Sequence, residues 1–403
     1  MKKLLAILLV CAMAFVLVAA CAADETPAAT PTPAPAATPA PADTPAPADP
    51  GNNDEEPPPP AIEGLDIRVA LVAHGPESIQ FDGSFNEGSW NGILDFMAQH
   101  GLNPATNANF FQAHAPDDDA RVDIMADAIA WGADILVLPG FHFAASVYEA
   151  ANLFTDTMFV VLDTTTSPGP TPANVVTIVY AEEQSGFLAG YGVVMEGFRD
   201  LGFMGGIAVP AVVRFGHGFV EGAELAAQEL GLAPGEVTIS YHYIGGFAPS
   251  PEVQTMAAAW YAGGTELIFV AAGRAWDSVL TAADAGDNRW LVGVDVDQSG
   301  VSPLFMTSAM KALGVSVADM LNDFAADRFR GGSDLLFDAA LNGVGLPMDN
   351  SHFTTFTQAQ YDAVFAQLAD GTIVVSTVLP GEGQAPDPNN FLNLELVVVN
   401  FIS

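Results

Sequence analysis

The feature that most constrains this chain is a regular alternation, from residue 67 onward, of short apolar runs with segments of helical pattern. The apolar runs, rich in Val, Ile, Leu and Phe, lie at 67–73, 135–138, 159–162, 175–180, 203–210, 237–243, 267–271 and 290–294. The helical segments between them lie at 86–99, 119–131, 184–199, 217–230 and 252–261. Buried strands separated by helices are typical of βαβ units. The sequence therefore predicts an α/β fold with parallel sheets.

Two segments of the chain repeat one plan. Residues 132–140 read Gly-Ala-Asp-Ile-Leu-Val-Leu-Pro-Gly, and residues 264–273 read Gly-Thr-Glu-Leu-Ile-Phe-Val-Ala-Ala-Gly. Each passes from a helix-ending glycine through an acidic residue into an apolar strand that closes on another glycine. A chance match of one common βα pattern is one interpretation, but two similar lobes explain the repeat better.

The ends of the predicted strands indicate where a ligand would bind. Ligands in open α/β sheets lie beyond the carboxyl ends of the strands. The residues that close or directly follow predicted strands here are Gly140, Asp163, Gly273 and Asp295. We therefore expect these four residues near a cleft.

The first twenty residues have the pattern of a secretion signal. Lys2 and Lys3 precede an apolar run at 4–18, and Ala-Ala then leads into Cys21. This junction resembles the lipobox of bacterial lipoproteins, so we predict a lipoprotein signal peptide over 1–20 and lipidation of Cys21. The alternative is ordinary cleavage nearby, with Cys21 incidental.

Residues 21–62 have a composition that cannot form a core. They are nearly all Ala, Pro, Thr, Asp and Glu, with four consecutive prolines at 57–60. Such a chain favours extended conformations, so we predict a disordered stalk that holds a folded part away from a surface. The folded part, 63–403, contains neither of the two cysteines and is long enough for two domains.

The charge of the chain excludes several partners. The 48 acidic residues against 11 Lys and Arg give a net charge of −37, which disfavours nucleic acid and anionic lipid surfaces. Lys2, Lys3 and Lys311 are the only lysines, so cleavage of the signal would leave Lys311 alone. A composition that avoids lysine so thoroughly makes this residue a candidate for a specific role.

The first candidate site segment is Asp82-Gly-Ser-Phe-Asn-Glu-Gly-Ser-Trp90, which leads from the first strand into a helix. Ser84 or Asn86 has the side chain to cap that helix, and Asp82 suits its positive end. A helix N-terminus beside a cleft also offers N–H groups to a ligand. Trp90 lies one turn beyond Asn86 on the same helix face.

Three more segments carry candidate ligand-binding residues. Asp163 follows an apolar strand, where a carboxylate either forms a turn or accepts hydrogen bonds from a ligand. Phe247 lies in a Gly- and Pro-rich loop, and the fourth segment contains Asp295 and then Lys311. The sequence has no G-x-S-x-G, Walker A or H-E-x-x-H motif, and its seven histidines show no metal-ligand spacing. We therefore predict no enzyme activity, no metal and no cofactor.

These motifs together resemble the basic membrane protein family, which includes purine nucleoside receptor lipoproteins of ABC importers. The resemblance runs from about residue 67 to residue 375. The matching motifs keep the family's order, at 82–86, 183–190, 202–206, 271–273, 293–298 and 308–311. The family implies a type I periplasmic binding protein, with two Rossmann-like lobes joined by a hinge. Lobe 1 would comprise about 65–165 plus 295–345, and lobe 2 about 166–294 plus 346–403.

The resemblance also implies roles for individual residues. Trp90 and Phe247 would stack on the two faces of a base, and Asp295 would accept the ribose hydroxyls with Lys311 close by. Other ligand-binding positions would be Asp82, Ser84, Asn86, Asp163 and Gly273. Phe81 and Gly83 depart from the family's D-D-K-S-F-N motif, so base-edge preference is expected to differ.

The expected function is that of a monomeric, lipid-anchored solute-binding protein on the extracytoplasmic face of the cell membrane. It would bind a nucleoside, with a purine base preferred, and deliver it to an ABC permease. One alternative is a surface lipoprotein that senses its ligand without transport. Another is an extracellular nucleoside hydrolase, for which the acidic run 117–119 is the only candidate calcium cluster, although that run also suits the start of a helix.

Overall fold

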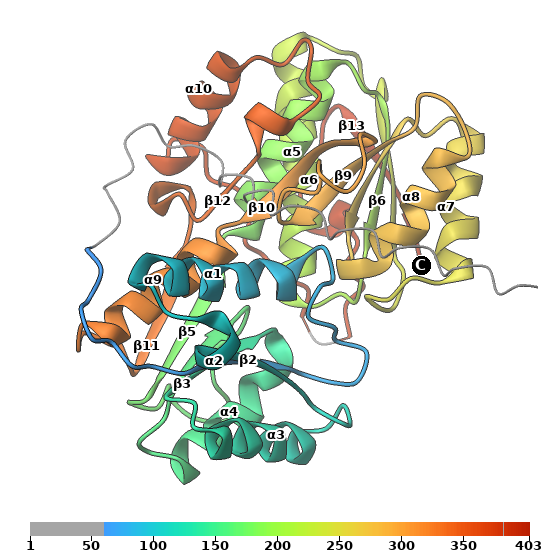
Figure 1. Cartoon of the computed structure of the whole chain (residues 1–403). Coiled ribbons are helices and arrows are strands. Elements are labelled where there is room, and N and C mark those ends of the chain that lie inside the picture. The colour runs from blue at the N-terminus through green and yellow to red at the C-terminus, as the bar shows by residue number, and fades with distance from the viewer. Residues whose placement is uncertain (1–59, 382) are drawn as a thin grey trace, which may run out of the picture. The chain divides into compact units, whose positions relative to one another are not determined.

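The computed structural model describes residues 60–381 and 383–403 (Figure 1). The predicted signal peptide, Cys21 and almost all of the predicted stalk lie outside the described residues. The described part of the chain contains two separate β-sheets, each flanked by helices. No helix in that part has the length and apolar character needed to cross a membrane.

The first sheet is built entirely from parallel pairs. Its strands lie in the order β11-β5-β4-β3-β1-β2. Their bounds are β1 Val69–Ala73, β2 Ala108–Gln112, β3 Ile135–Pro139, β4 Met158–Leu162, β5 Val175–Tyr180 and β11 Ser333–Phe337. The helices that belong to it are α1 Phe85–His100, α2 Pro104–Asn107, α3 Asp118–Trp131, α4 Ala144–Leu153 and α9 Leu313–Ala325. This sheet and its helices are called lobe 1.

The second sheet has the order β12-β10-β9-β8-β6-β7-β13, and only the β12–β10 pair is antiparallel. Its strands are β6 Asp200–Gly205, β7 Val237–Tyr243, β8 Leu267–Ala271, β9 Trp290–Asp295, β10 Phe305–Lys311, β12 Val344–Gly345 and β13 Val397–Ile402. Its helices are α5 Glu182–Glu196, α6 Pro210–Leu230, α7 Pro251–Gly263, α8 Trp276–Asp284 and α10 Gln358–Ala369. This sheet and its helices are called lobe 2.

Both sheets are covered on two faces, which explains the apolar strands. In lobe 1, consecutive strand residues point to opposite faces of the sheet. Leu71 packs in a core cluster shared with α1 and α9, and Val72 packs in a second cluster shared with α3 and α4. In lobe 2, α7 and α8 cover one face, and α5 and α6 cover the other. The predicted α/β fold with parallel sheets is therefore confirmed.

Several strands were not predicted from the sequence. The strands β2, β11 and β13 lie at sheet edges, where only part of each strand is buried. The fully buried β10 carries Thr307, Ser308 and Lys311 among its apolar residues, which hides the strand pattern.

The division of the chain between the lobes differs from the predicted one. The predicted first boundary lies near residue 165, but β5 pairs with β4, so lobe 1 extends to Tyr180. We placed 295–345 in lobe 1, but β10 pairs with β9 and β12 with β10, so both strands belong to lobe 2. Hydrogen bonding between strands far apart in the chain decides this, and the local pattern does not encode it.

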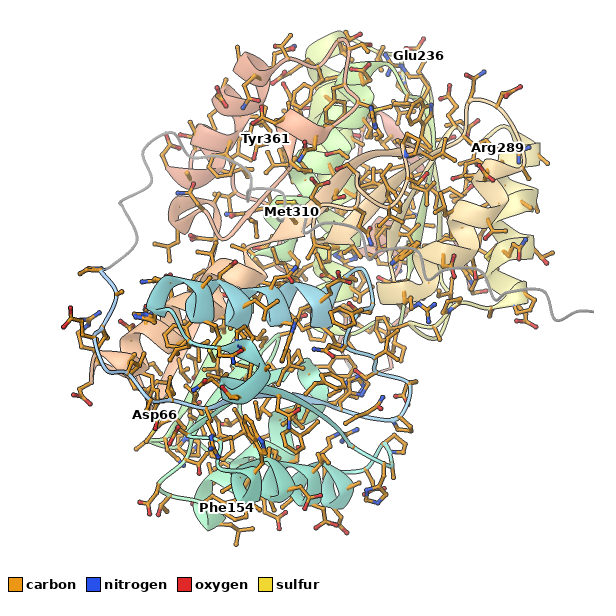
Figure 2. The ribbon with its side chains drawn as sticks, in the orientation of Figure 1. Asp66, Phe154, Glu236, Arg289, Met310 and Tyr361 are labelled. Atoms are coloured by element: carbon orange, nitrogen blue, oxygen red, sulfur yellow. The ribbon has the colours of Figure 1, made fainter. Side chains whose placement is uncertain are left out.

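Three connections pass between the lobes: β5 to α5, β10 to α9, and β11 to β12. They bond to one another directly, because Ala181 N donates to Phe337 O at 3.0 Å and Ala312 N donates to Gly343 O at 3.0 Å. The hydroxyl of Ser185 donates to Met310 O, also at 3.0 Å. Figure 2 labels Met310, the buried neighbour of Lys311 on β10. Lys311 and Glu182 thus flank the connections between the lobes.

The helices α5 and α6 cross at unusually close range. A Cβ atom at Gly190 would overlap the carbonyl oxygen of Phe219, and one at Gly222 would overlap that of Phe187. Only glycine permits this approach of two backbones. The contact brings the start of α5 beside α6, and so places Glu182 next to Arg214.

Candidate functional site

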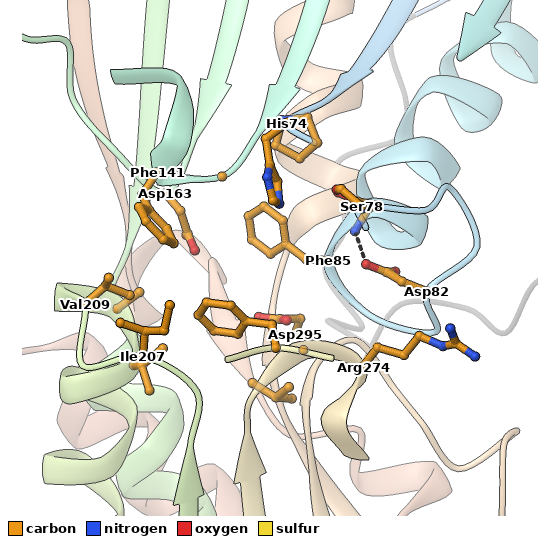
Figure 3. Close-up of a pocket in the computed structure, with 18 of the residues that line it drawn as sticks. His74, Ser78, Asp82, Phe85, Phe141, Asp163, Ile207, Val209, Arg274 and Asp295 are labelled. Carbon is orange, nitrogen blue, oxygen red and sulfur yellow. Dashed lines mark hydrogen bonds between the residues drawn. The ribbon is translucent and has the colours of Figure 1, made fainter. Parts of the chain in front are cut away.

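A cavity of about 410 Å³ lies where the carboxyl ends of strands from both sheets meet. Figure 3 shows Asp163 and Phe141 of lobe 1 across the cavity from Ile207, Val209 and Asp295 of lobe 2. Of the predicted ligand-binding residues, those that line it are Asp82, Asn86, Asp163, Phe247, Gly273, Asp295 and Lys311. Gly140, expected near the cleft from its position after a strand, lines it too.

Asp82 organises the loop that leads into α1. Its carboxylate accepts hydrogen bonds from the backbone N–H groups of Ser84 at 2.9 Å, Asn86 at 3.1 Å and Glu87 at 3.1 Å. Burial raises the pKa of Asp82 to about 6, although these three N–H groups favour the charged form. Asp82 thus accepts hydrogen bonds from the free N–H groups at the start of α1, a capping role that the sequence suggested for Ser84 or Asn86.

Asn86 and Ser84 have other partners. The side-chain amide of Asn86 donates to Ser78 Oγ at 2.9 Å and to Ile79 O at 2.8 Å, which ties the start of α1 to the loop after β1. Ser84 is fully buried and does not line the cavity. Its hydroxyl donates to Asp295 Oδ2 at 2.7 Å, so Ser84 holds a cavity carboxylate instead of facing a ligand.

Lys311 lies among carboxylates from both lobes. Its Nζ donates to Asp163 Oδ1 at 2.9 Å and Oδ2 at 2.7 Å, and lies 3.4 Å from Glu182 Oε1 and 3.6 Å from Asp295 Oδ1. The Lys311 side chain is 2% exposed, yet the residue lines the cavity. Burial alone would lower the pKa of Lys311, but Asp163, Glu182 and Asp295 outweigh it and raise the pKa.

Burial raises the pKa values of two of the carboxyl groups around Lys311, those of Asp163 and Asp295. Burial raises the pKa of Asp163 to about 7, against the attraction of Lys311. Burial also raises the pKa of Asp295, again opposed by Lys311 and by the Ser84 hydrogen bond. Asp163 and Asp295 both have left-handed backbone conformations, with φ of 64° and 71°. Such strain at the ends of β4 and β9 is typical of functional sites, where it directs a side chain.

A second layer of charge lies behind Lys311. Arg214 Nε donates to Glu182 Oε2 at 2.7 Å and lies 3.6 Å from Glu183 Oε2. Glu182 is fully buried, and burial raises the pKa of Glu183 to about 7. Neither Glu182 nor Glu183 lines the cavity. The motif over 183–190 indicated this region, but the sequence did not single out Glu182 or Arg214.

Aromatic rings line the cavity from both lobes. Phe247, in the loop after β7, lies with its ring centroid 6.4 Å from that of Phe141, in the turn after β3, at an interplanar angle of 55°. The rings of Phe141 and His142 stack at 3.9 Å, and those of His142 and His74 also at 3.9 Å. The ammonium group of Lys311 lies over the ring of Phe85, with Nζ 5.0 Å from the ring centroid.

Trp90 was assigned wrongly to the cavity. Its side chain packs in the hydrophobic core of the protein, is 9% exposed and does not line the cavity. The helix α1 begins at Phe85, so the first turn meets the cavity and Trp90 lies farther along, among core residues. Phe141 was missed, because nothing in its local sequence, Pro-Gly-Phe-His-Phe, distinguishes a cavity ring from a core ring.

The acidic run 117–119 belongs to a helix start and not to a cation site. Asp117 accepts a hydrogen bond from Ala120 N at 2.9 Å and caps α3, and Asp118 pairs with Arg121 at 2.9 Å. No group of His, Cys, Asp and Glu suited to a metal ion occurs among the residues that the structure describes.

The sequence over 67–374 matches the family described as ABC transporter substrate-binding protein, PnrA-like. This match covers more than half of the chain. The chain belongs to the PnrA-like family. PnrA-like proteins are ABC transporter substrate-binding proteins, and the two-sheet architecture with a cavity between the strand ends agrees with that class.

Relatives of this PnrA-like protein cover most of its length. The ABC transporter nucleoside-binding protein BmpA of Lactococcus lactis subsp. cremoris is 26% identical, over 77% of this chain and 89% of BmpA. Basic membrane protein A of Borreliella burgdorferi is 25% identical, over 76% of this chain and 87% of that protein.

Solved structures show the same fold. A solute-binding protein of an ABC transporter system from Aeropyrum pernix K1 has a TM-score of 0.61, with 21% identity, over 80% of this chain and 84% of that one. A second, from Conexibacter woesei, has a TM-score of 0.60, with 21% identity, over 78% of this chain and all of that one. The PnrA-like protein therefore has the solute-binding fold expected from its sequence.

Proposed function

We propose that this protein captures a nucleoside, with a purine base preferred, in the cavity between its lobes and delivers it to an ABC permease. The observation that carries this proposal is that one cavity has both an aromatic wall and a charged wall. One part offers aromatic rings from both lobes, Phe141 and Phe247, and another offers the carboxylates of Asp163 and Asp295 with Lys311 between them. A nucleoside has a flat apolar base and a hydroxylated sugar that match these two parts.

The aromatic part favours a base. Phe141 and Phe247 come from different lobes, so a base between them would contact both lobes at once. A slight separation or rotation of the two rings, now 6.4 Å apart at their centroids, would admit a flat ring. Phe141 replaces Trp90 as the proposed partner of Phe247, because Phe141 lines the cavity and Trp90 does not. Base–aromatic stacking contributes about 1–3 kcal/mol per base.

The charged part favours a neutral sugar over a phosphate. Ionised Asp163 and Asp295 accept hydrogen bonds, and a vicinal diol can donate both of its hydroxyls to one carboxylate. A phosphate would face Asp82, Asp163 and Asp295 with only Lys311 and Arg274 as cations on the cavity lining among the described residues. Nucleotides should therefore bind much more weakly than nucleosides.

The relatives support the ligand class and the cellular setting. One is named a nucleoside-binding protein, and substrate-binding proteins of ABC transporters act outside the cytoplasm. The Ala-Ala-Cys21 junction and the proline-rich stalk support attachment to the cell membrane through a lipid on Cys21. A stalk of this kind would let a monomeric binding protein reach the permease.

Isothermal titration calorimetry tests the proposal directly. A panel of inosine, guanosine, adenosine, cytidine, their 5′-monophosphates, the free bases, ribose and riboflavin should show tightest binding for a purine nucleoside. Monophosphates should bind at least about tenfold more weakly, because the phosphate would face the carboxylates of Asp82, Asp163 and Asp295 and like charges brought together cost several kcal/mol. Absence of nucleoside binding, or preferential binding of riboflavin or ribose, would contradict the proposal. Release of free base from inosine during incubation would instead indicate a hydrolase.

A further inference from the structure

Glu182 is a buried carboxylate that touches the proposed ligand site only through another side chain. It is the first residue of α5, directly after the chain leaves lobe 1, and its side chain is 0% exposed. It does not line the cavity. Within the described residues, its Oε2 accepts the hydrogen bond from Arg214 Nε, whereas its Oε1 has no hydrogen-bond partner and lies 3.4 Å from Lys311 Nζ.

Burial of the Glu182 carboxylate is energetically costly and requires a compensating interaction. Removing an ionised carboxylate from water costs several kcal/mol, and burial is tolerated when the charge is paired. Arg214 supplies that pairing through a 2.7 Å contact. The second oxygen of Glu182 is then held toward Lys311 by the same contact, since the close crossing of α5 and α6 fixes the distance between the start of α5 and the part of α6 that carries Arg214.

The four groups form a line of alternating charge across the connection between the lobes. Asp163 of lobe 1 contacts Lys311, Lys311 faces Glu182, and Glu182 contacts Arg214 of lobe 2. Asp295 approaches Lys311 from the side, at 3.6 Å. Without Glu182, the ammonium group would have carboxylates only on its cavity side. It would then be free to move toward Asp163 and Asp295.

We propose that Glu182 and Arg214 are positioning residues, which hold the Lys311 ammonium group charged and fixed between Asp163 and Asp295. Glu182 attracts Lys311 from behind the cavity, and Arg214 keeps the Glu182 carboxylate oriented toward it. The affinity measurement below rests on the proposed function, whereas the measurement on Lys311 itself does not. In consequence, the ligand would meet a lysine whose position is set by the connection between the lobes.

Lys311 can be observed selectively, since the full chain has only two other lysines, Lys2 and Lys3. In the full chain labelled with [13Cε]lysine, the Lys2→Arg and Lys3→Arg variants assign those two signals in the NMR spectrum. The wild-type Lys311 signal should stay that of a charged ammonium group to about pH 11, beyond the ordinary lysine range. In Glu182→Gln, which keeps the shape and removes the charge, the pKa of Lys311 should fall by about one unit.

Two further variants separate positioning from folding. Glu182→Gln removes the shorter ion pair of Arg214 and leaves the longer one to Glu183. The double variant Glu182→Gln/Arg214→Met removes both charges and so avoids a poorly paired buried cation. It should fold and show the same lowered pKa of Lys311. The control is Arg330→Met, which breaks a 2.8 Å contact to Asp323 and does not line the cavity. It should leave the Lys311 signal unchanged.

The same variants test the effect on the ligand site, with inosine as the probe. Glu182→Gln and Arg214→Met should each weaken inosine binding by about tenfold, the scale of one weakened charge-assisted contact. Arg214→Lys should restore most of the loss, whereas Arg330→Met should change affinity less than twofold. An unchanged Lys311 signal and pKa in folded Glu182→Gln would overturn the inference. A shifted signal with no nucleoside binding in any variant would uphold the inference and refute the proposed function.

Discussion

Lys311 Nζ lies 2.7 Å from Asp163 Oδ2, and this bond joins the last residue of β10 in lobe 2 to the residue that follows β4 in lobe 1. The two residues are 148 positions apart in the chain. Their contact lies beside the connections between the lobes and at the wall of the cavity. A change in the relative position of the lobes would therefore change this contact, and with it the charged wall of the proposed ligand site.

Replacing Lys311 by Met should weaken nucleoside binding by about 1.5–3 kcal/mol, the range for a charge-assisted hydrogen bond. Binding of the free base hypoxanthine should suffer much less than binding of inosine, since the lost contact is on the sugar side. Calorimetry with both ligands checks this. Equal losses for base and nucleoside would move Lys311 away from the sugar.

The same variant should become sensitive to pH. Without Lys311, the pKa values of Asp163 and Asp295 should rise further above those of the unfolded chain. Groups with raised folded-state pKa values stabilise the fold at acidic pH, and that contribution is lost as pH rises through the folded pKa. Lys311→Met should thus melt at a lower temperature than wild type at pH 8 and recover much of the difference at pH 5. A constant difference would contradict this.

The aromatic assignment predicts opposite behaviour for two kinds of ring. Phe141→Ala and Phe247→Ala should each weaken nucleoside binding by about 1–3 kcal/mol with little loss of stability. Trp90→Ala should lower the free energy of unfolding by about 3–5 kcal/mol, because its side chain packs in the core. Chemical denaturation and calorimetry on the three variants distinguish the roles. A stable Trp90→Ala that no longer binds nucleosides would restore the stacking role predicted from the sequence.

Nucleoside binding should strengthen as pH rises from about 5.5 to 8, because an ionised carboxylate accepts a hydroxyl hydrogen bond at each oxygen, whereas a protonated one carries a donor on one of them. Burial raises the pKa of Asp82 to about 6 and that of Asp163 to about 7, so part of each population is protonated in this range. Binding should therefore release protons near pH 6.5. Calorimetry in two buffers of different ionisation enthalpy measures that release, and proton uptake would contradict the model of the site.

Stability of the free protein is a less direct readout of the same groups. The raised pKa values of Asp82 and Asp163 contribute to the free energy of unfolding at acidic pH. This contribution is lost as pH rises through about 6 for Asp82 and about 7 for Asp163. Burial lowers the pKa values of His74 and His142 to about 4, and their contribution is lost as pH falls below the ordinary histidine range. The two contributions oppose each other, so ligand affinity is the measurement that isolates the carboxylates.

The close crossing of α5 and α6 predicts a large effect of a single methyl group. Gly190→Ala places a Cβ against the carbonyl oxygen of Phe219 and should destabilise the protein by about 1–3 kcal/mol or more. Gly263→Ala is the matched control, because its Cβ would meet nothing within 4 Å. It should be neutral or stabilise by up to about 1 kcal/mol. Thermal melts of both variants check this, and equal melting temperatures would contradict the packing argument.

The lipid anchor is tested at Cys21, which lies outside the described residues. Protein from native cells should partition into the detergent phase of a phase-separation assay. Cys21→Ala should abolish lipidation, and the protein should then appear in the medium or remain as unprocessed precursor. Membrane association with normal processing in Cys21→Ala would show that Cys21 is incidental. A Cys11→Ala variant is the control, since Cys11 lies within the predicted signal and should not affect the anchor.

The sequence by itself determined the α/β class and much of the cavity lining. Both follow from local physics: strands buried on two faces are continuously apolar, and parallel strands place the residues after their ends on one edge. Asp163, Gly273 and Asp295 were located in this way, without knowledge of which strands pair. Lys311 was located by its rarity in the composition, and Phe247 by its place in a Gly- and Pro-rich loop.

Only the tertiary structure decided which side chains meet. The choice of Phe141 over Trp90 depends on where α1 begins and which of its faces the core covers. The role of Glu182 depends on a helix crossing that glycines on both helices permit. The division of the lobes depends on β5 and β10 pairing with particular neighbours. These contacts join residues far apart in the chain, and their energies depend on burial and distance. Local sequence patterns carry neither quantity.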